Sequence, residues 1–188
     1  MVRFSNWLGG RTTGGIALGA LVVFVVFTAL VLPRQAREAE ASSGNTGSPD
    51  TSLFYTAGEL YDWAEEYGAA GRQAYVRARL RFDVVWPLVY TLFLTTALSW
   101  LMARAFAAGS GWRRANVVPL LGMLFDFLEN GSTSLVMARY PVETPVVAEM
   151  AGVLTLVKWL FVGGSFTLLL VGIAAVGWWR LRRRGEPV

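Results

Sequence analysis

Apolar residues in this chain gather into long runs, and the polar residues lie mostly between the runs. Four such runs occur, at residues 15–32, 84–103, 117–138 and 146–179. The first two contain no charged side chain. Asp126 and Glu129 interrupt the third, and Lys158 lies in the fourth. Each run is long enough to cross the ~30 Å hydrocarbon core of a bilayer as a helix.

This pattern predicts an all-α polytopic membrane protein, a four-transmembrane-helix bundle with an extra outer amphipathic helix. A helix of a soluble bundle would carry a charged stripe, and these runs have none. The predicted division of the chain is 1–33 as a first transmembrane helix with a cytoplasmic tail, 34–51 as a flexible outer linker, 52–82 as an outer helical segment, 83–179 as a three-helix transmembrane core, and 180–188 as a basic cytoplasmic tail.

The first run also resembles a signal peptide, because Arg3 and Arg11 precede it. Two features favour a retained helix instead. The run exceeds the usual apolar length of about 7–15 residues, and the charged stretch PRQAREAE follows it where a small-residue cleavage site would lie.

The segment TAGELYDWAEEYG predicts a short helix between the first two spans. Thr56 and Glu59 have the spacing of a capping box, and Leu60, Trp63 and Tyr67 recur at helical intervals. Two interpretations are open. The helix lies on the membrane surface with its aromatic residues as an anchor, or it caps the bundle without touching lipid.

Arginines in the tails and short loops predict the orientation. Four spans place them on one side, which the positive-inside rule makes cytoplasmic. They are Arg3 and Arg11, Arg104, Arg113 and Arg114, and those of the final RLRRRGEPV. The expected location is the cell membrane, multi-pass, with both termini cytoplasmic. The net charge of +4 is then a topology signal, so we expect membrane lipids as partners and no nucleic acid.

The composition limits the chemistry. Apolar residues make up 54% of the chain, above the usual share of a soluble domain, and there is neither cysteine nor histidine. Disulfides, thiolate and histidine-based catalysis, common zinc sites and histidine-bound haem are excluded. We expect no cofactor and no metal, because two carboxylates alone make a thin case for Mg²⁺ or Ca²⁺. Gly15 and Gly19 allow a homo-oligomer or packing within the chain.

Asp126, Glu129 and Asn130 are the unusual feature of the third run. Their spacing places all three on one helical face, together with the small residues Gly122 and Thr133. Helix geometry places the two acids ~15–20 Å below the outer boundary. A charge there costs at least ~2.5–3.5 kcal/mol, so we expect a shared proton, a counter-ion or strong hydrogen bonds.

Polar residues on the neighbouring spans are candidate partners. Lys158, the single lysine, shares a face with Thr155, and Asp83 shares one with Tyr90. Together with the acidic triad they predict an outward-opening polar pocket. An alternative is that the polar residues only staple the helices together. Ion conduction is less consistent with the chain, because the residues on the cytoplasmic side of Asp126 are apolar.

Several motifs resemble an uncharacterised family of small four-span bacterial membrane proteins. The stretches are EEYGAAGRQAY, FDVVWPLVY, PLLGMLFDFLEN and VLTLVKWLFV, with the patterns Y-G-x-x-G-R, D-x-x-x-P-x-x-Y, D-x-x-E-N and K-W within residues 60–165. The matching positions are Tyr67, Gly68, Gly71, Arg72, Asp83, Pro87, Tyr90, Asp126, Glu129, Asn130, Lys158 and Trp159. The resemblance implies a four-span fold and no particular reaction.

Three functions fit these observations. The leading hypothesis is a membrane protein that binds a lipid-like or other amphiphilic molecule, with Asp126, Glu129 and Asn130 at the site and Lys158, Asp83, Tyr90 and Thr155 around it. The second is a lipid-modifying enzyme that uses the acidic pair for acid/base chemistry. The third is a structural or accessory membrane protein whose polar residues fix helix packing.

Overall fold

The computed structural model describes residues 2–43, 47–49 and 52–184 of the chain. This part of the chain contains helices and no strand, as the apolar runs predict. The helices are α1 (Val2–Arg11), α2 (Gly14–Leu30), α3 (Leu32–Ser43), α4 (Ala57–Glu66), α5 (Gly68–Ala105), the 3₁₀ helix η2 (Gly111–Val117), α6 (Val118–Arg139) and α7 (Pro145–Arg184).

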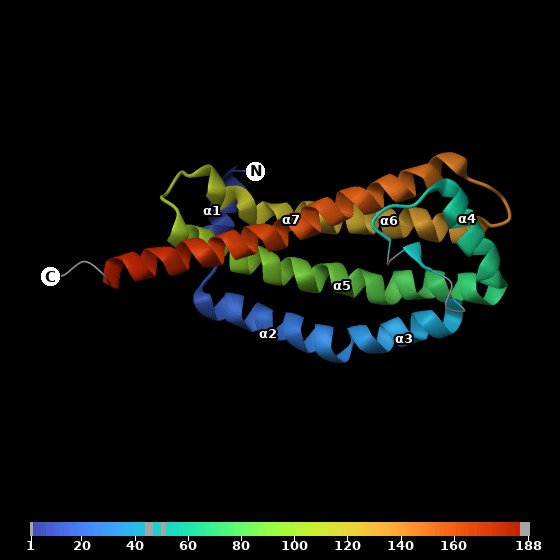
Figure 1. Ribbon diagram of the computed structural model, residues 1–188, viewed down its shortest axis with the longest axis horizontal. Helices are drawn as coiled ribbons and strands as arrows, with labels where there is room; N and C mark the ends of the chain where they lie inside the picture. Colours follow the sequence, from blue (N-terminus) through green and yellow to red (C-terminus); the bar gives the residue numbers. More distant parts are fainter. Residues whose placement is uncertain (1, 44–46, 50–51, 185–188) are drawn as a thin grey trace.

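The long helices lie roughly parallel to one axis (Figure 1). Helix α5 packs against α6 and α7 on one side and against α2 and α3 on the other. Helices α1 and η2 and the carboxyl-terminal part of α7 lie at one end of the bundle, and α4 lies at the opposite end (Figure 1). Because α5 and α7 run in the same direction and α6 runs against both, α6 brings its polar face between them.

Three helices are long and apolar enough to cross a membrane. They are Gly14–Glu38, which joins α2 to α3, then Gly68–Ala105 and Pro145–Arg182. Helix α6 is not among them, since Asp126, Glu129 and Asn130 lower the hydropathy of its 22 residues. The structure therefore supports a helical membrane protein with three candidate spans.

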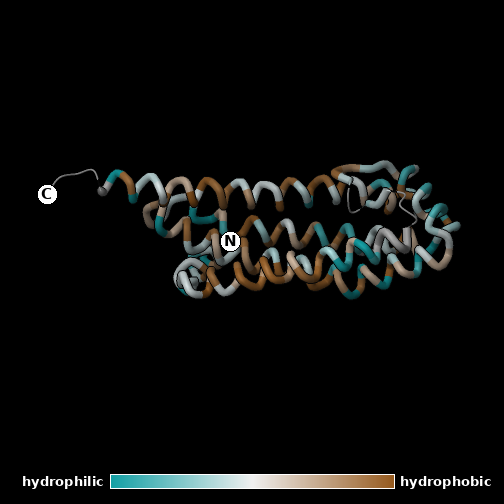
Figure 2. The backbone as a smooth tube through the Cα atoms, turned by 60° about the horizontal axis from the view of Figure 1, so that its bottom comes forward, coloured by the Kyte–Doolittle hydropathy of each residue, from teal (hydrophilic) through white to brown (hydrophobic). Residues whose placement is uncertain are grey.

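Burial differs sharply among these helices. In its most apolar stretch α5 is 67% buried, whereas the corresponding values are 11% for the first candidate span and 17% for α7. Figure 2 shows apolar residues along the middle of the long helices and hydrophilic residues around α4 and the start of α5. Apolar helices that expose most of their surface suit a lipid environment, because a soluble protein rarely leaves so large an apolar area in water.

Local sequence signals fix several helix ends. The Thr56 hydroxyl accepts from the backbone N–H of Glu59, and the Glu59 carboxylate accepts from the backbone N–H of Thr56, so the predicted capping box is present. Proline occupies the start of α6 and of α7, where a missing N–H costs no helical hydrogen bond. Gly68 has φ of +60°, which allows the tight change of direction between α4 and α5.

Helix α4 caps the bundle. Its Leu60 and Ala64 are fully buried, and they pack with Tyr67, Val136 and Met137. The apolar side of α4 is therefore turned into the protein, so Leu60 and Tyr67 do not face lipid. Of the two interpretations of this helix, the structure favours the cap over the surface anchor.

Two expectations from the sequence need correction. The linker expected over 34–51 is helical through Ser43, because α3 continues the first span after a bend at Val31; residues 44–46 and 50–51 lie outside the described residues. Gly19 has open space around the position that a side chain would occupy, so Gly15 and Gly19 do not pack against another described helix. The amino-terminal tail forms α1, which docks on η2 and α5.

Candidate functional site

Asp126 joins α6 to α5. Its carboxylate accepts from the Tyr90 hydroxyl at 2.9 Å and from the Asn130 side-chain amide at 2.9 Å. All three side chains are buried. Asn130 is one helical turn beyond Asp126, so their contact follows from the i,i+4 spacing, whereas Tyr90 comes from the neighbouring helix.

Glu129 joins α6 to α7. One carboxylate oxygen lies 2.5 Å from the Lys158 ammonium, and the other accepts from the Thr155 hydroxyl at 2.8 Å. Glu129 is 1% exposed and Lys158 is 8% exposed, so this ion pair is removed from solvent. The Tyr55 hydroxyl lies 3.2 Å from the Thr155 hydroxyl and extends the network into the segment before α4.

Asp83 forms a separate ion pair within α5. The Arg79 guanidinium donates to the Asp83 carboxylate at 2.6 Å, one helical turn away. Arg79 is buried, and Asp83 is only slightly exposed. The structure thus brings all seven predicted residues to one region of α5, α6 and α7, arranged as three sets of contacts.

Small residues allow this close packing. A Cβ at Gly122 would lie 3.0 Å from a methyl carbon of Val162, which confirms that this glycine admits a second helix, α7. One turn before Thr155, a Cβ at Gly152 would overlap the carbonyl oxygen of Tyr55. The close approach at Gly152 is what places the Tyr55 hydroxyl beside Thr155.

A cavity of about 430 Å³ lies between α5 and α6, and we call it the Asp83 chamber. It is lined by Val76, Arg79, Leu80, Asp83, Val84, Phe127, Asn130, Gly131, Ser134 and Leu135. Its rim is apolar and open, since Leu80 is 69% exposed, Leu135 44% and Val84 43%. Of the predicted site residues, Asp83 and Asn130 line this chamber, while Asp126, Glu129, Tyr90, Thr155 and Lys158 do not.

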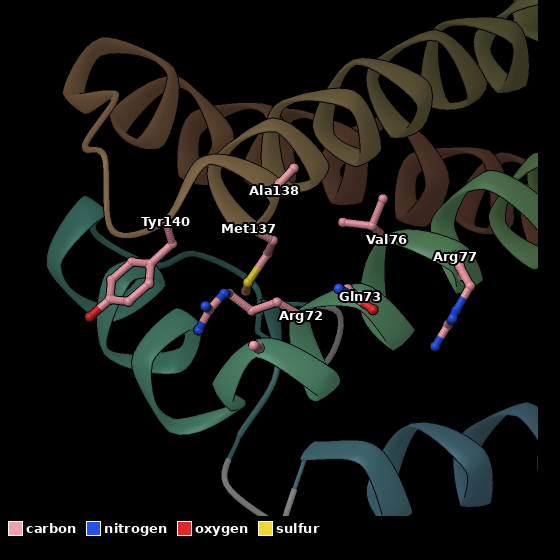
Figure 3. Close-up of a pocket in the computed structure, with 8 residues that line it drawn as sticks. Arg72, Gln73, Val76, Arg77, Met137, Ala138 and Tyr140 are labelled. Atoms are coloured by element: carbon pink, nitrogen blue, oxygen red, sulfur yellow. The ribbon is translucent and has the colours of Figure 1, made fainter.

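A second cavity of about 440 Å³, the Arg72 chamber, adjoins the first, because Val76 lines both. Its lining residues are Ala69, Arg72, Gln73, Val76, Arg77, Met137, Ala138 and Tyr140 (Figure 3). The two chambers follow one another along the contact of α5 and α6, and we refer to them together as the groove. It runs from the end of the bundle that carries α4 toward the middle of the bundle.

One positive charge influences several carboxylates of the site. The Lys158 ammonium attracts the carboxylates of Asp126 and Asp83 as well as that of Glu129. Outside the candidate spans, burial raises the pKa of the Tyr55 phenol well above its usual range, so Tyr55 is a neutral hydroxyl group. Among the described residues, no three acidic side chains gather as ligands for a metal ion.

Sequence reasoning missed two residues of the site, Tyr55 and Ser134. Tyr55 lies in a non-helical segment, and only the small pair Ala151–Gly152 on α7 hints that another segment approaches there. Ser134 looks like an ordinary helix residue, yet its hydroxyl is buried at the Asp83 chamber and has no hydrogen-bond partner among the described residues.

Another polar cluster, which the sequence pattern does not predict, lies at the opposite end of the bundle. The Asn116 side-chain amide donates to the Ser5 carbonyl oxygen and to the Ser99 hydroxyl, and the Ser5 hydroxyl donates to Asn116. These bonds join α1, α5 and η2, so the cluster holds the amino-terminal helix in place.

Comparison with known proteins adds no relative. No protein-family model, no curated protein and no solved structure matches this chain. The resemblance to small four-span bacterial membrane proteins stays a prediction.

Proposed function

We propose that the chain is a four-span integral membrane protein with both termini on the cytoplasmic side. Helix α6 is about 33 Å long at 1.5 Å per residue, which matches a bilayer core of ~30 Å. It packs between α5 and α7, so those helices cover its polar face. Arg11, Arg104, Arg113 and Arg114 lie toward the end of the bundle that carries both termini, which supports a cytoplasmic position for that end.

Within this arrangement the groove between α5 and α6 binds an amphiphilic small molecule from the outer half of the membrane. The Asp83 chamber combines an open apolar rim with polar groups at its base, as sites for amphiphiles require. Its volume falls within the ~300–1,000 Å³ range of small-molecule sites.

The Ser134 hydroxyl is the observation that carries this proposal. It lies buried at the chamber without a hydrogen bond, and such a group costs about 1–3 kcal/mol. Asn130 uses one amide hydrogen for Asp126 and also lines the same chamber. A ligand that offers a hydroxyl or carbonyl group there would satisfy groups that lipid tails leave unsatisfied.

The buried network has a different role in this proposal. Glu129, Lys158 and Thr155 satisfy one another and line neither chamber. Their contacts support a structural function, holding α6 against α7. The alternative of an acid/base enzyme draws less support, because Asp126 and Glu129 do not face the groove. Asp83 and Asn130 are the predicted residues that would touch the ligand.

A substitution at Gly131 tests the ligand site. Gly131 lines the Asp83 chamber, and a side chain added there meets open space, so Gly131→Phe should fill the chamber without a clash in the protein. Gly163→Phe is the matched control, because Gly163 also faces open space in a helix and lines neither chamber. Ser134→Ala removes the unsatisfied hydroxyl and should leave the fold intact.

The measurement is mass spectrometry of small molecules that co-purify in mild detergent. We expect a defined amphiphile with the wild type and with Gly163→Phe, less of it with Ser134→Ala, and none with Gly131→Phe. The proposal is wrong if the folded wild type carries no such compound after incubation with a total lipid extract, or if Gly131→Phe retains as much as the control.

A further inference from the structure

The two sides of the Arg72 chamber differ in polarity. Helix α5 contributes the polar residues Arg72, Gln73 and Arg77, whereas α6 contributes the apolar residues Met137 and Ala138. Figure 3 shows Gln73 between the two arginine side chains. Among the residues that the structure describes, no acidic side chain lines this chamber. Two guanidinium groups and an amide without a lining carboxylate favour an anion.

Arg72 is held in position by the fold. Its guanidinium donates to the Ala64 carbonyl oxygen at 2.7 Å and lies over the Tyr140 ring, 4.8 Å from the ring centre. A guanidinium has five N–H donors, so these contacts leave donors for a ligand. An arginine that is already oriented loses less conformational entropy when it binds an anion.

The other end of the groove offers no net charge. The Asp83 carboxylate is compensated by Arg79 at 2.6 Å, so that end presents neutral hydrogen-bonding groups rather than a site for a cation. Ser134 can donate a hydrogen bond there, and Asn130 borders the same space. The groove therefore changes from cationic to neutral polar along its length.

The spacing along α5 sets the size of the ligand. Arg77 precedes Asp83 by six residues and Arg72 precedes it by eleven, which correspond to about 9 Å and about 16 Å of helix. Leu80, Val84 and Leu135 then form an exposed apolar rim. An occupant that fits this order carries an anionic head, a polar middle with carbonyl oxygens, and an apolar tail.

We propose that the ligand is an anionic glycerophospholipid. Its anionic head lies over Gln73, with Arg72 on one side and Arg77 on the other, an ester carbonyl accepts from the Ser134 hydroxyl, and an acyl chain runs along the rim of the Asp83 chamber. This inference rests on the proposed binding of an amphiphile in the groove and adds the chemical class of its head.

The test measures lipid binding to the purified full chain by native mass spectrometry. The probes are phosphatidylglycerol and phosphatidylcholine with the same acyl chains, titrated in a neutral detergent. The variants are Arg72→Gln, Arg77→Gln and the double variant. Arg81→Gln is the matched control, because Arg81 is an exposed arginine of the same helix that lines neither chamber.

We expect the wild type to prefer phosphatidylglycerol, and each chamber substitution to reduce its binding about fivefold, the effect of one basic residue near an anionic lipid. The double variant should lose the preference, and Arg81→Gln should retain it. Arg77→Gln is decisive if Arg72→Gln unfolds, since Arg77 is exposed and its side chain makes no hydrogen bond or ion pair with the described residues.

Other results would overturn the inference in distinguishable ways. If both lipids bind equally and Gly131→Phe abolishes their binding, the amphiphile site stands, but the preference for an anionic head is refuted. Displacement by soluble glycerol phosphate at equal concentration would mean that the chamber binds a free phosphate ester and not a lipid. An equal loss in Arg81→Gln would mean general surface attraction. If neither lipid binds and Gly131→Phe changes nothing in the co-purified molecules, the proposed binding of an amphiphile in the groove is refuted as well.

Discussion

Replacement of Lys158 by methionine tests how the buried network stabilises the bundle. Lys158 is the counter-ion of Glu129, at 2.5 Å, and both side chains are almost fully buried. Methionine retains most of the length and the apolar stem of lysine, so packing changes little. What changes is the charge, because Glu129 keeps only the Thr155 hydroxyl as a partner.

The cost follows from the loss of one partner of a buried pair. Removing one member leaves an uncompensated charge and typically costs about 3–5 kcal/mol, which is a factor of roughly 10²–10⁴ in the unfolding equilibrium. Glu129→Gln should cost less, since the amide oxygen of the new side chain still accepts from Thr155 and Lys158 lies within the electrostatic reach of Asp126. The double variant should return to within about 1 kcal/mol of the wild type, because neither charge is then buried.

Reversible unfolding in mixed detergent micelles, followed by tryptophan fluorescence, measures these differences. Leu156→Met on the exposed side of α7 controls for the methionine itself. The reasoning fails if Lys158→Met costs less than about 1 kcal/mol, or if the double variant loses the sum of the two single losses. Either result would mean that the ion pair does not stabilise the contact of α6 with α7.

Three further predictions concern the contacts of α4 and of the segment before it. Gly152→Ala should cost about 1–3 kcal/mol, because its methyl group would overlap the Tyr55 carbonyl oxygen, whereas Gly163→Ala should gain up to about 1 kcal/mol; thermal unfolding in one detergent compares them. Thr56→Ala should cost about 1 kcal/mol by the same assay, since it removes the cap of α4. The hydrogen bond from the Thr56 backbone N–H lowers the pKa of the Glu59 carboxyl. The contribution of Glu59 to folding stability is therefore fully present above about pH 4.5, and it is lost as the pH falls through the lower pKa of the folded state. The difference in Tm between wild type and Glu59→Gln should therefore close on acidification.

Much of the helical core could be predicted because long apolar runs have few alternatives in a membrane. The spacing of Asp126, Glu129 and Asn130 also predicts a shared face, and two of them do contact each other. Lys158, the single lysine, is predicted as a candidate partner of the acidic residues, and the structure places it beside Glu129. The shared face of α6 follows from distances along one helix, which a sequence gives directly.

The groove could not be predicted in the same way. Whether Asn130 and Ser134 border a cavity depends on how α6 is rotated against α5, and the sequence does not contain that rotation. The helix over 34–43 escapes prediction for a different reason. Its small polar residues are typical of linkers, but a helix that leaves the membrane can continue without an apolar face when it packs along α5.

The polar residues of α6 face two different directions around the helix. Glu129 faces α7, where Lys158 is its partner, whereas Gly131 and Ser134 face the groove. Asn130 joins the regions, since it bonds Asp126 and borders the groove. A bound lipid should therefore stabilise the α5–α6 contact by ligand linkage, about 2.7 kcal/mol at a concentration of one hundred times its Kd. Because the ion pair of Glu129 and Lys158 lies apart from the groove, this gain should be nearly the same in the wild type and in Lys158→Met, and absent in Gly131→Phe.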